Sequence, residues 1–239
     1  MAQIKANEAL VKALQTWNID HLYGIPGDSV DAVVDSLRTV RDQFKFYHVR
    51  HEEVASLAAA SYTKMTGKIG VALSIGGPGI VHLLNGMYDA KMDNVPQLII
   101  AGQTNSTLLG TKFFQETNIS KMVDDVAVYH HQIQKGDNVF EITNEAIRTA
   151  YEKKGVSVII CPNDLLTQKI KDTTNRAVDT TKPKPASPKF KSIKKAAKLI
   201  DKAKKPVMLI GLGTQHAKDE LREFIEAAKI PVIHTLPAK

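Results

Sequence analysis

The stretch IGVALSIGGPGIVHLLNGMYDAKMDNVPQLIIAG, residues 69–102, decides the fold class. It opens with a continuous apolar run at 69–75, turns through GGPG, and continues with apolar residues at helical spacing over 80–92. A second apolar run, QLIIAG at 97–102, follows. Strands that are apolar throughout, rather than alternately apolar and polar, are typical of parallel sheets buried on both faces. The stretch therefore predicts a strand–helix–strand unit of a parallel sheet.

The same alternation extends over the first 175 residues. Helical periodicity and short apolar or aromatic runs follow one another. The predicted helices cover residues 6–17, 29–40, 52–66, 80–92 and 140–153, and the predicted strands cover 21–26, 44–49, 69–75, 97–102, 130–134 and 156–161. We expect an α/β fold with a parallel sheet and helices on both faces. In such sheets ligands bind beyond the carboxyl ends of the strands, which brings the loops at 26–27, 51–52 and 76–79 to one edge.

Charge is distributed unevenly along the 239 residues, whose net charge is +7. Residues 1–180 carry 18 Lys and Arg against 20 Asp and Glu, whereas residues 181–239 carry 14 against 5. The change falls at TKPKPASPK, 181–189, a composition that favours an extended linker. We expect one domain at 1–175, a linker at 176–190, and the truncated beginning of a second α/β domain at 191–239. The second part repeats the pattern, with helices at 191–204 and 217–229 and strands at 206–213 and 231–235.

Composition disfavours several classes of protein. No apolar run approaches the roughly 20 residues that a membrane helix needs, and the N-terminus lacks the apolar core of a signal peptide. Cys161 is the single cysteine, which favours a reducing cytoplasm. The basic tail could bind nucleic acid, but its only aromatic residues for base stacking are Phe190 and Phe224. We therefore expect no membrane and no nucleic-acid partner, and a basic binding module remains a distant alternative.

Two motifs are ambiguous when they are taken alone. GGPG at 76–79 could cradle a phosphate, but it lacks the Gly-Lys-Ser/Thr ending of a P-loop and a tight turn is favoured. Glu52 and Glu53 begin a predicted helix, where acidic side chains favour the helix dipole. A catalytic role would require one carboxyl group to lie in a cleft, where burial would raise its pKa.

No His, Asp or Glu cluster has metal-ligand spacing such as H-E-x-x-H, so we expect no metal site in this chain.

Five motifs in one order make the pattern far more specific. They are YGIPG (23–27), VRHEE (49–53), TGKIGV (66–71), GGPGIVHLLNGMYDAKMDNVPQLIIAGQ (76–103) and FFQE (113–116). Together they closely resemble the N-terminal, pyrimidine-binding domain of thiamine-diphosphate-dependent enzymes. Within this superfamily the chain is most similar to the pyruvate oxidases, because GPGIVHLLNG places His82 where acetolactate synthases usually have Asn. The resemblance covers about residues 1–175 and continues into the tail as the start of the family's central domain.

The resemblance implies roles for individual residues. Glu52 matches the family's activating glutamate, whose carboxyl group hydrogen-bonds N1′ of the cofactor's aminopyrimidine ring and so promotes removal of the thiazolium C2 proton. Phe114 and Gln115 match a pair that lines the substrate pocket. The remaining residues expected to bind the cofactor are Pro26, Gly27, Gly77, Pro78, Gly79 and His82.

The implied activity is the oxidative decarboxylation of pyruvate with phosphate and oxygen to acetyl phosphate, carbon dioxide and hydrogen peroxide. The implied cofactors are thiamine diphosphate, Mg²⁺ and FAD, with the cofactor between the subunits of a homodimer or homotetramer. The family's Gly-Asp-Gly…Asn motif, which holds Mg²⁺, is absent from the 239 residues, and the FAD-type central domain is cut short. We therefore expect this chain alone to be inactive. An acetolactate synthase or another 2-keto-acid decarboxylase is the main alternative.

Overall fold

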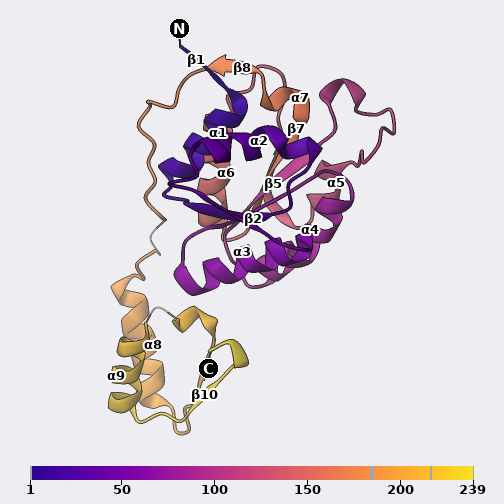
Figure 1. Ribbon diagram of the computed structural model, residues 1–239. Helices are drawn as coiled ribbons and strands as arrows, with labels where there is room; N and C mark the ends of the chain where they lie inside the picture. Colours follow the sequence, from indigo (N-terminus) through magenta and orange to yellow (C-terminus); the bar gives the residue numbers. More distant parts are fainter. Residues whose placement is uncertain (1, 184–185, 216, 239) are drawn as a thin grey trace. The chain divides into compact units, whose positions relative to one another are not determined.

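A computed structural model describes residues 2–183, 186–215 and 217–238, and the chain divides into two compact units, Met1–Pro183 and Lys184–Lys239. The larger unit contains a six-stranded sheet with helices on both faces (Figure 1). All of its neighbouring strands pair in parallel, in the order β3-β2-β4-β5-β7-β6. The predicted α/β class with a parallel sheet is confirmed.

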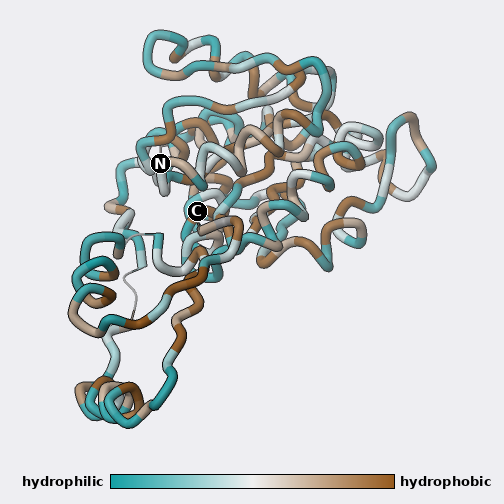
Figure 2. Tube along the Cα trace, turned by 90° about the horizontal axis from the view of Figure 1, so that it is seen from below, coloured by the Kyte–Doolittle hydropathy of each residue, from teal (hydrophilic) through white to brown (hydrophobic). Residues whose placement is uncertain are grey.

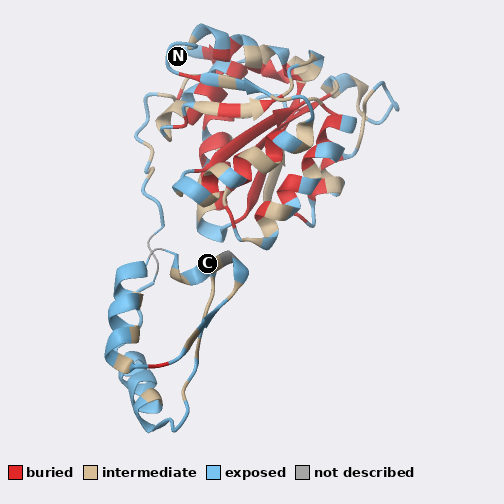
Figure 3. Ribbon diagram, turned by 60° about the horizontal axis from the view of Figure 1, so that its bottom comes forward, coloured by how far each residue is buried: buried red, intermediate tan, exposed pale blue. Residues whose placement is uncertain are grey.

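The strands in the middle of the sheet are buried at every residue, as their unbroken apolar runs predict. Figure 3 shows them in red beneath the helices. The six strands are β2 (His21–Gly24), β3 (Lys45–His48), β4 (Gly70–Ser74), β5 (Gln97–Gln103), β6 (Ala127–Gln132) and β7 (Val156–Pro162). β6 begins three residues before the predicted 130–134 strand and ends earlier.

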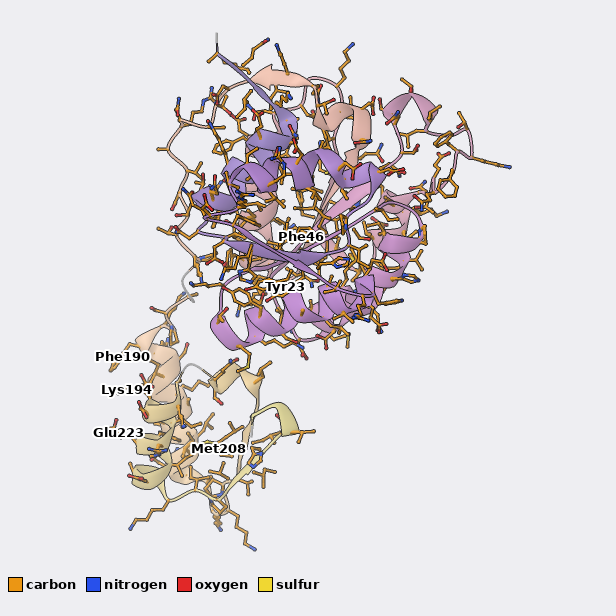
Figure 4. All side chains as sticks on the ribbon, in the orientation of Figure 1. Tyr23, Phe46, Phe190, Lys194, Met208 and Glu223 are labelled. Atoms are coloured by element: carbon orange, nitrogen blue, oxygen red, sulfur yellow. The ribbon has the colours of Figure 1, made fainter. Side chains whose placement is uncertain are left out.

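Two apolar cores lie on opposite faces of the sheet. Successive side chains of a strand point to opposite faces, so Leu98 and Ile100 join one core while Ile99 joins the other. In Figure 4 the same division is marked by Phe46, which packs against the first core, and Tyr23, which packs against the second. The first core is covered by α1 (Ala6–Thr16), α2 (Asp31–Thr39) and α6 (Val139–Lys153), and the second by α3 (Glu52–Thr66), α4 (Pro78–Met92) and α5 (Ile119–Val123).

Several short elements escape the sequence pattern. β1 (Gln3–Lys5) pairs antiparallel with β8 (Lys169–Lys171), and the helix α7 (Asn163–Leu166) directly follows β7. These segments, like α5, are three to five residues long, which is too short for a period of 2 or 3.6 to be recognised. β1 and β8 form a separate two-stranded sheet, so the order of the six-stranded sheet is unaffected.

The smaller unit contains two helices and a two-stranded parallel sheet. Its elements are α8 (Phe190–Lys202), β9 (Met208–Ile210), α9 (Lys218–Ala228) and β10 (Val232–His234). Figure 2 shows hydrophilic and hydrophobic residues mixed along its helices. Among its described residues only Ile230 is buried, while Leu199 and Leu209 are more than 60% exposed. The described part of this unit therefore has little core of its own.

The two units divide between Pro183 and Lys184, within the predicted linker at 176–190. Val178 packs against the first core and the Lys182 ammonium donates a hydrogen bond to the carbonyl of Gly67, so the chain up to 183 lies along the larger unit. The functional limits of the domains stay a prediction.

In the described part of the chain, none of the helices is both long enough and apolar enough to cross a membrane.

Gly86 lets α3 and α4 approach each other closely. A Cβ atom at Gly86 would lie 2.6 Å from the carbonyl carbon of Ser56 and 2.5 Å from the backbone nitrogen of Leu57. Ala ordinarily stabilises a helix by about 1 kcal/mol relative to Gly, but backbone atoms cannot yield to the new methyl group. We expect Gly86→Ala to lower the free energy of unfolding by about 1–3 kcal/mol, measured by urea denaturation.

The matched control is Val81→Ala, which places Ala on an exposed part of the same helix. That variant should stay within about 0.5 kcal/mol of the parent. A Gly86→Ala protein at least as stable as the parent would show that the two helices are not held this close.

Candidate active site

Three loops meet at the carboxyl edge of the sheet. The backbone N–H of Val49, after β3, donates to the carbonyl of Gly24 at the end of β2, with N and O 3.1 Å apart. The backbone N–H of Gly76, after β4, donates to the Ser29 hydroxyl, also at 3.1 Å. The loops that follow β2, β3 and β4 are thus joined by hydrogen bonds, as parallel pairing predicts.

Glu52 is the first residue of α3 and its carboxyl group is held from α4. His82 Nδ1 lies 2.9 Å from Glu52 Oε2. The Glu52 side chain is only 13% exposed, whereas the His82 side chain is 43% exposed. The structure therefore brings together two of the predicted site residues, from helices that start 26 residues apart.

The adjacent carboxylate lies in a more open position. Glu53 is 37% exposed, accepts a hydrogen bond from the Asn85 amide, and lies 3.7 Å from His51 Nδ1. Of the two acidic residues at the start of α3, Glu52 is thus the one that is withdrawn from water. This difference distinguishes them structurally, while the catalytic role of Glu52 stays a prediction.

Opposing effects act on the Glu52 carboxyl group. Burial raises its pKa, while the hydrogen bond from His82, a backbone hydrogen bond and the charges of His82 and His51 lower it. The lowering effects are larger in sum, so the pKa lies below its usual value and the group is ionised at neutral pH. Burial raises the pKa of Glu52 as expected, but the net shift is downward because of the histidine partner, which sequence position alone does not show.

His51 is a part of this site that sequence reasoning did not assign. Its imidazole ring stacks on that of His82, with centroids 4.4 Å apart and planes inclined by 28°. The ring is carried by the residue before α3 and meets a ring on α4. Only its position next to Glu52 could have suggested it, because no spacing rule joins residues that lie 31 positions apart.

The glycines of the turns are required by the chain's own packing. Gly77 has φ +58°, and a Cβ there would lie 2.6 Å from the carbonyl oxygen of Gln115. A Cβ at Gly27 would lie 2.6 Å from Ile75 Cγ2, and one at Gly79 would clash with the Ser74 hydroxyl. These contacts give a structural reason for the glycines, and close contact with a cofactor ring stays a prediction.

Proline residues flank two of these turns in different settings. Pro78 is the first residue of α4, a position where its missing N–H costs nothing. Pro26 lines a groove of about 320 Å³ whose other walls include Leu37, Phe44 and Phe46, on the α2 side of the sheet. Pro26 is thus at the carboxyl edge but faces a different surface from Glu52 and His82.

The loop after β5 brings Gln115 beside Gly77. Gln115 has the left-handed φ of +61°, and Phe114 next to it is 76% exposed. The Glu116 carboxylate accepts hydrogen bonds from the backbone N–H groups of Gly110 and Phe113, which hold the pKa of Glu116 below its usual value. Glu116 therefore fixes the loop that presents Phe114 and Gln115, a role the sequence pattern did not reveal.

Other candidate groups have separate partners. His130 lies 3.6 Å from Asp124, and His131 hydrogen-bonds Asp137 at 2.7 Å, so the two adjacent rings face different carboxylates. Burial raises the pKa of the Cys161 thiol to about 12, which leaves it protonated and unreactive at neutral pH.

The sequence of this chain matches two profiles of one enzyme family. Residues 4–122 match the sequence profile described as the thiamine pyrophosphate enzyme, N-terminal TPP binding domain, and residues 193–239 match that of the thiamine pyrophosphate enzyme, central domain. YdaP of Bacillus subtilis, whose name provisionally describes it as thiamine pyrophosphate-containing, is 47% identical over 239 residues, which are 100% of this chain and 42% of that protein.

Two relatives with named activities are also similar. A pyruvate oxidase of Lactiplantibacillus plantarum is 39% identical over 238 residues, 99% of this chain and 40% of the relative. An acetolactate synthase of Mycobacterium leprae is 33% identical over 241 residues, 99% of this chain and 38% of the relative. The chain thus spans about two fifths of the length of these relatives.

The downward pKa shift of Glu52 gives a direct test of the His82 contact. In His82→Ala the hydrogen bond and the imidazole charge are lost while burial remains, so the pKa of Glu52 should rise. The lowered pKa stabilises the folded state above the usual pKa of a glutamate, and this stabilisation is lost as the pH falls through the folded-state value. NMR titration of ¹³C-labelled glutamate carboxyl groups measures the shift.

His130→Ala is the control, because it removes a comparable histidine–carboxylate pair that does not involve Glu52. That variant should leave the titration of Glu52 unchanged. An equal pKa for Glu52 in the parent and in His82→Ala would contradict the contact.

Proposed function

This chain belongs to the thiamine pyrophosphate enzyme family, and we propose that it forms the pyrimidine-binding part of a pyruvate oxidase. The proposed reaction of the whole protein converts pyruvate, phosphate and oxygen into acetyl phosphate, carbon dioxide and hydrogen peroxide. Because the chain spans about two fifths of its relatives, this activity is proposed for the complete protein. We also propose that it works in the cytoplasm.

The Glu52 carboxylate is the observation that supports the proposal. It is withdrawn from water at the carboxyl edge of a parallel sheet, and its hydrogen bond to His82 involves Oε2. A carboxylate has two oxygens and about four lone-pair sites, so it can accept a further hydrogen bond while His82 holds it in place. A protonated ring nitrogen of an aminopyrimidine is a suitable donor to this carboxylate, and the residues therefore fit the pyrimidine end of thiamine diphosphate.

When bound, thiamine diphosphate supplies a thiazolium carbon that takes up the electrons released when a 2-keto acid loses carbon dioxide. The proposed task of Glu52 is to share one proton with the ring nitrogen N1′: the neutral carboxyl group donates its hydrogen to N1′, and the ionised carboxylate accepts a hydrogen bond from protonated N1′. His82 and His51 favour the ionised form of Glu52, so the group begins as a proton acceptor. His82 is thus proposed to position and polarise the carboxylate.

Phe114 and Gln115 are proposed to line the substrate side of the site. Their loop is fixed by Glu116 and touches the turn at Gly77. The Gln115 amide can donate a hydrogen bond to the carboxylate of pyruvate, and Phe114 offers an apolar surface that excludes water. Pro26, Gly27, Pro78 and Gly79 are proposed to shape the surrounding turns.

His82 favours a pyruvate oxidase over an acetolactate synthase. The resemblance places Asn at this position in acetolactate synthases, and an amide carries no charge that could lower the pKa of Glu52. The identity of 39% to a pyruvate oxidase and 33% to an acetolactate synthase supports the same choice. Acetolactate synthesis is the second candidate.

We propose that Mg²⁺ and most of the FAD bind to other parts of the complete enzyme. We also propose that the enzyme is a homo-oligomer in which thiamine diphosphate lies between two subunits.

The role of Glu52 is tested by Glu52→Gln in the complete enzyme loaded with thiamine diphosphate. The amide keeps the shape of the side chain but cannot share the proton. We expect exchange of the cofactor's C2 proton to slow by at least about 100-fold, measured by NMR in deuterated water.

Glu53→Gln removes the same charge one residue away, from a more exposed side chain. It should exchange the C2 proton within a few-fold of the parent rate. Similar rates for the parent and Glu52→Gln would remove Glu52 from its assigned role.

The choice between the two activities is tested by the products of the complete enzyme. With pyruvate, phosphate and oxygen, we expect acetyl phosphate and one molecule of peroxide for each carbon dioxide released. Peroxide is measured by a coupled peroxidase assay and acetolactate by its conversion to acetoin. Formation of acetolactate without peroxide would favour the second candidate.

A further inference from the structure

His51, Glu52 and His82 form a compact group of possible metal ligands. One ligand atom from each residue can be chosen so that all three lie within 4.8 Å of one another. The group combines two imidazoles and one carboxylate, and it joins the start of α3 to α4. None of the roles proposed above requires these side chains to hold a metal.

We propose that these three residues bind a divalent transition-metal ion of the Zn²⁺ class. Neutral imidazole nitrogen and carboxylate oxygen are the ligands that zinc takes in open sites, with two histidines, one glutamate and a water in the fourth position. Mg²⁺ prefers an octahedral shell of oxygen atoms and is poorly served by two imidazoles. The site is therefore distinct in chemistry from the magnesium site that the resemblance implies.

The distances require only small movements. Ligand atoms about 2.1 Å from a tetrahedral zinc lie roughly 3.4 Å from each other. His82 Nδ1 and Glu52 Oε2 are 2.9 Å apart, so a slight separation of this pair admits the ion between them. The His51 ring is already stacked on the His82 ring at 4.4 Å and must bring its nitrogen closer by a turn of the side chain.

Exposure permits these adjustments on the histidine side. The side chains of His51 and His82 are 48% and 43% exposed, so both rings can turn without disturbing the core. Glu52, at 13%, supplies a fixed oxygen. Glu53 Oε2 lies 3.7 Å from His51 Nδ1, and a carboxylate beside a ligating histidine is a common means of orienting the ring.

Metal binding and the proposed catalytic role use the same carboxylate. A bound ion would occupy a lone pair of Glu52 and prevent His82 from donating to it. The proposal itself rests only on the geometry of the three side chains, so it can fail without affecting the proposed function, and the reverse also holds.

The test uses the 239-residue chain without cofactor. Zn²⁺ binding is measured by isothermal titration, and Co²⁺ is used as a spectroscopic probe because its visible absorption reports nitrogen and oxygen ligands in a tetrahedral site. We expect saturable Zn²⁺ binding, a Co²⁺ absorption band that Zn²⁺ abolishes, and no effect of Mg²⁺ on either.

Single variants identify the ligands. His51→Gln and His82→Gln should each weaken Zn²⁺ binding at least 10-fold, since even residues that only orient a metal ligand contribute 10–100-fold to affinity. His130→Gln is the matched control, because His130 also lies beside a carboxylate but in a different part of the sheet, and it should bind Zn²⁺ as the parent does. Circular dichroism verifies that the variants remain folded.

The proposal is overturned if the parent shows no saturable Zn²⁺ binding up to millimolar concentration. It is also overturned if folded His51→Gln and His82→Gln proteins bind Zn²⁺ with the parent's affinity. A loss of binding in His130→Gln alone would place the metal elsewhere and would equally exclude the assigned site.

Discussion

The close packing of α3 against α4 is the constraint on which the candidate site depends. Glu52 begins one helix and His82 lies in the first turns of the other, so their 2.9 Å contact exists only if the helices stay near each other. Gly86 permits this approach because it presents no side chain to the backbone at Ser56. Farther along, the Lys64 ammonium lies 2.7 Å from Asp89 and 2.6 Å from Asp93, which ties the second half of α3 to α4. The site is therefore positioned by a helix pair rather than by the loops alone.

The sequence predicts the central strands of the sheet well because they are buried on both faces and must therefore be apolar at nearly every position. Residues such as Leu98 and Ile99 must both be apolar when each faces a separate core, and the resulting unbroken run is visible without a structure. Short elements such as β1 and β8 are held by pairing with distant residues, so their own sequences carry no recognisable period. The order of the strands in the sheet is likewise set by pairing between distant residues and cannot be read from the sequence pattern. β7 lies between β5 and β6 although β6 comes before β7 along the chain.

The candidate site was only partly predictable for a related reason. The motif order indicated Glu52 and His82 individually, but not that His82 donates to Glu52 or that His51 stacks on His82. Both contacts join the start of α3 to α4 and depend on tertiary packing. The sign of the pKa shift of Glu52 follows from these contacts, because burial alone acts in the opposite direction. A residue's role can thus be inferred from a motif, while its protonation state requires its neighbours.

The helices that hold the site also carry much of the exposed apolar surface of the larger unit. Val54 and Met65 on α3 are 50% and 85% exposed, and Val81 and Met92 on α4 are 49% and 74% exposed. Phe114, beside the same turn, is 76% exposed. Such side chains are individually unremarkable, but their concentration on two packed helices is typical of a surface that another protein part covers. The exposed apolar surface therefore supports the proposed homo-oligomer.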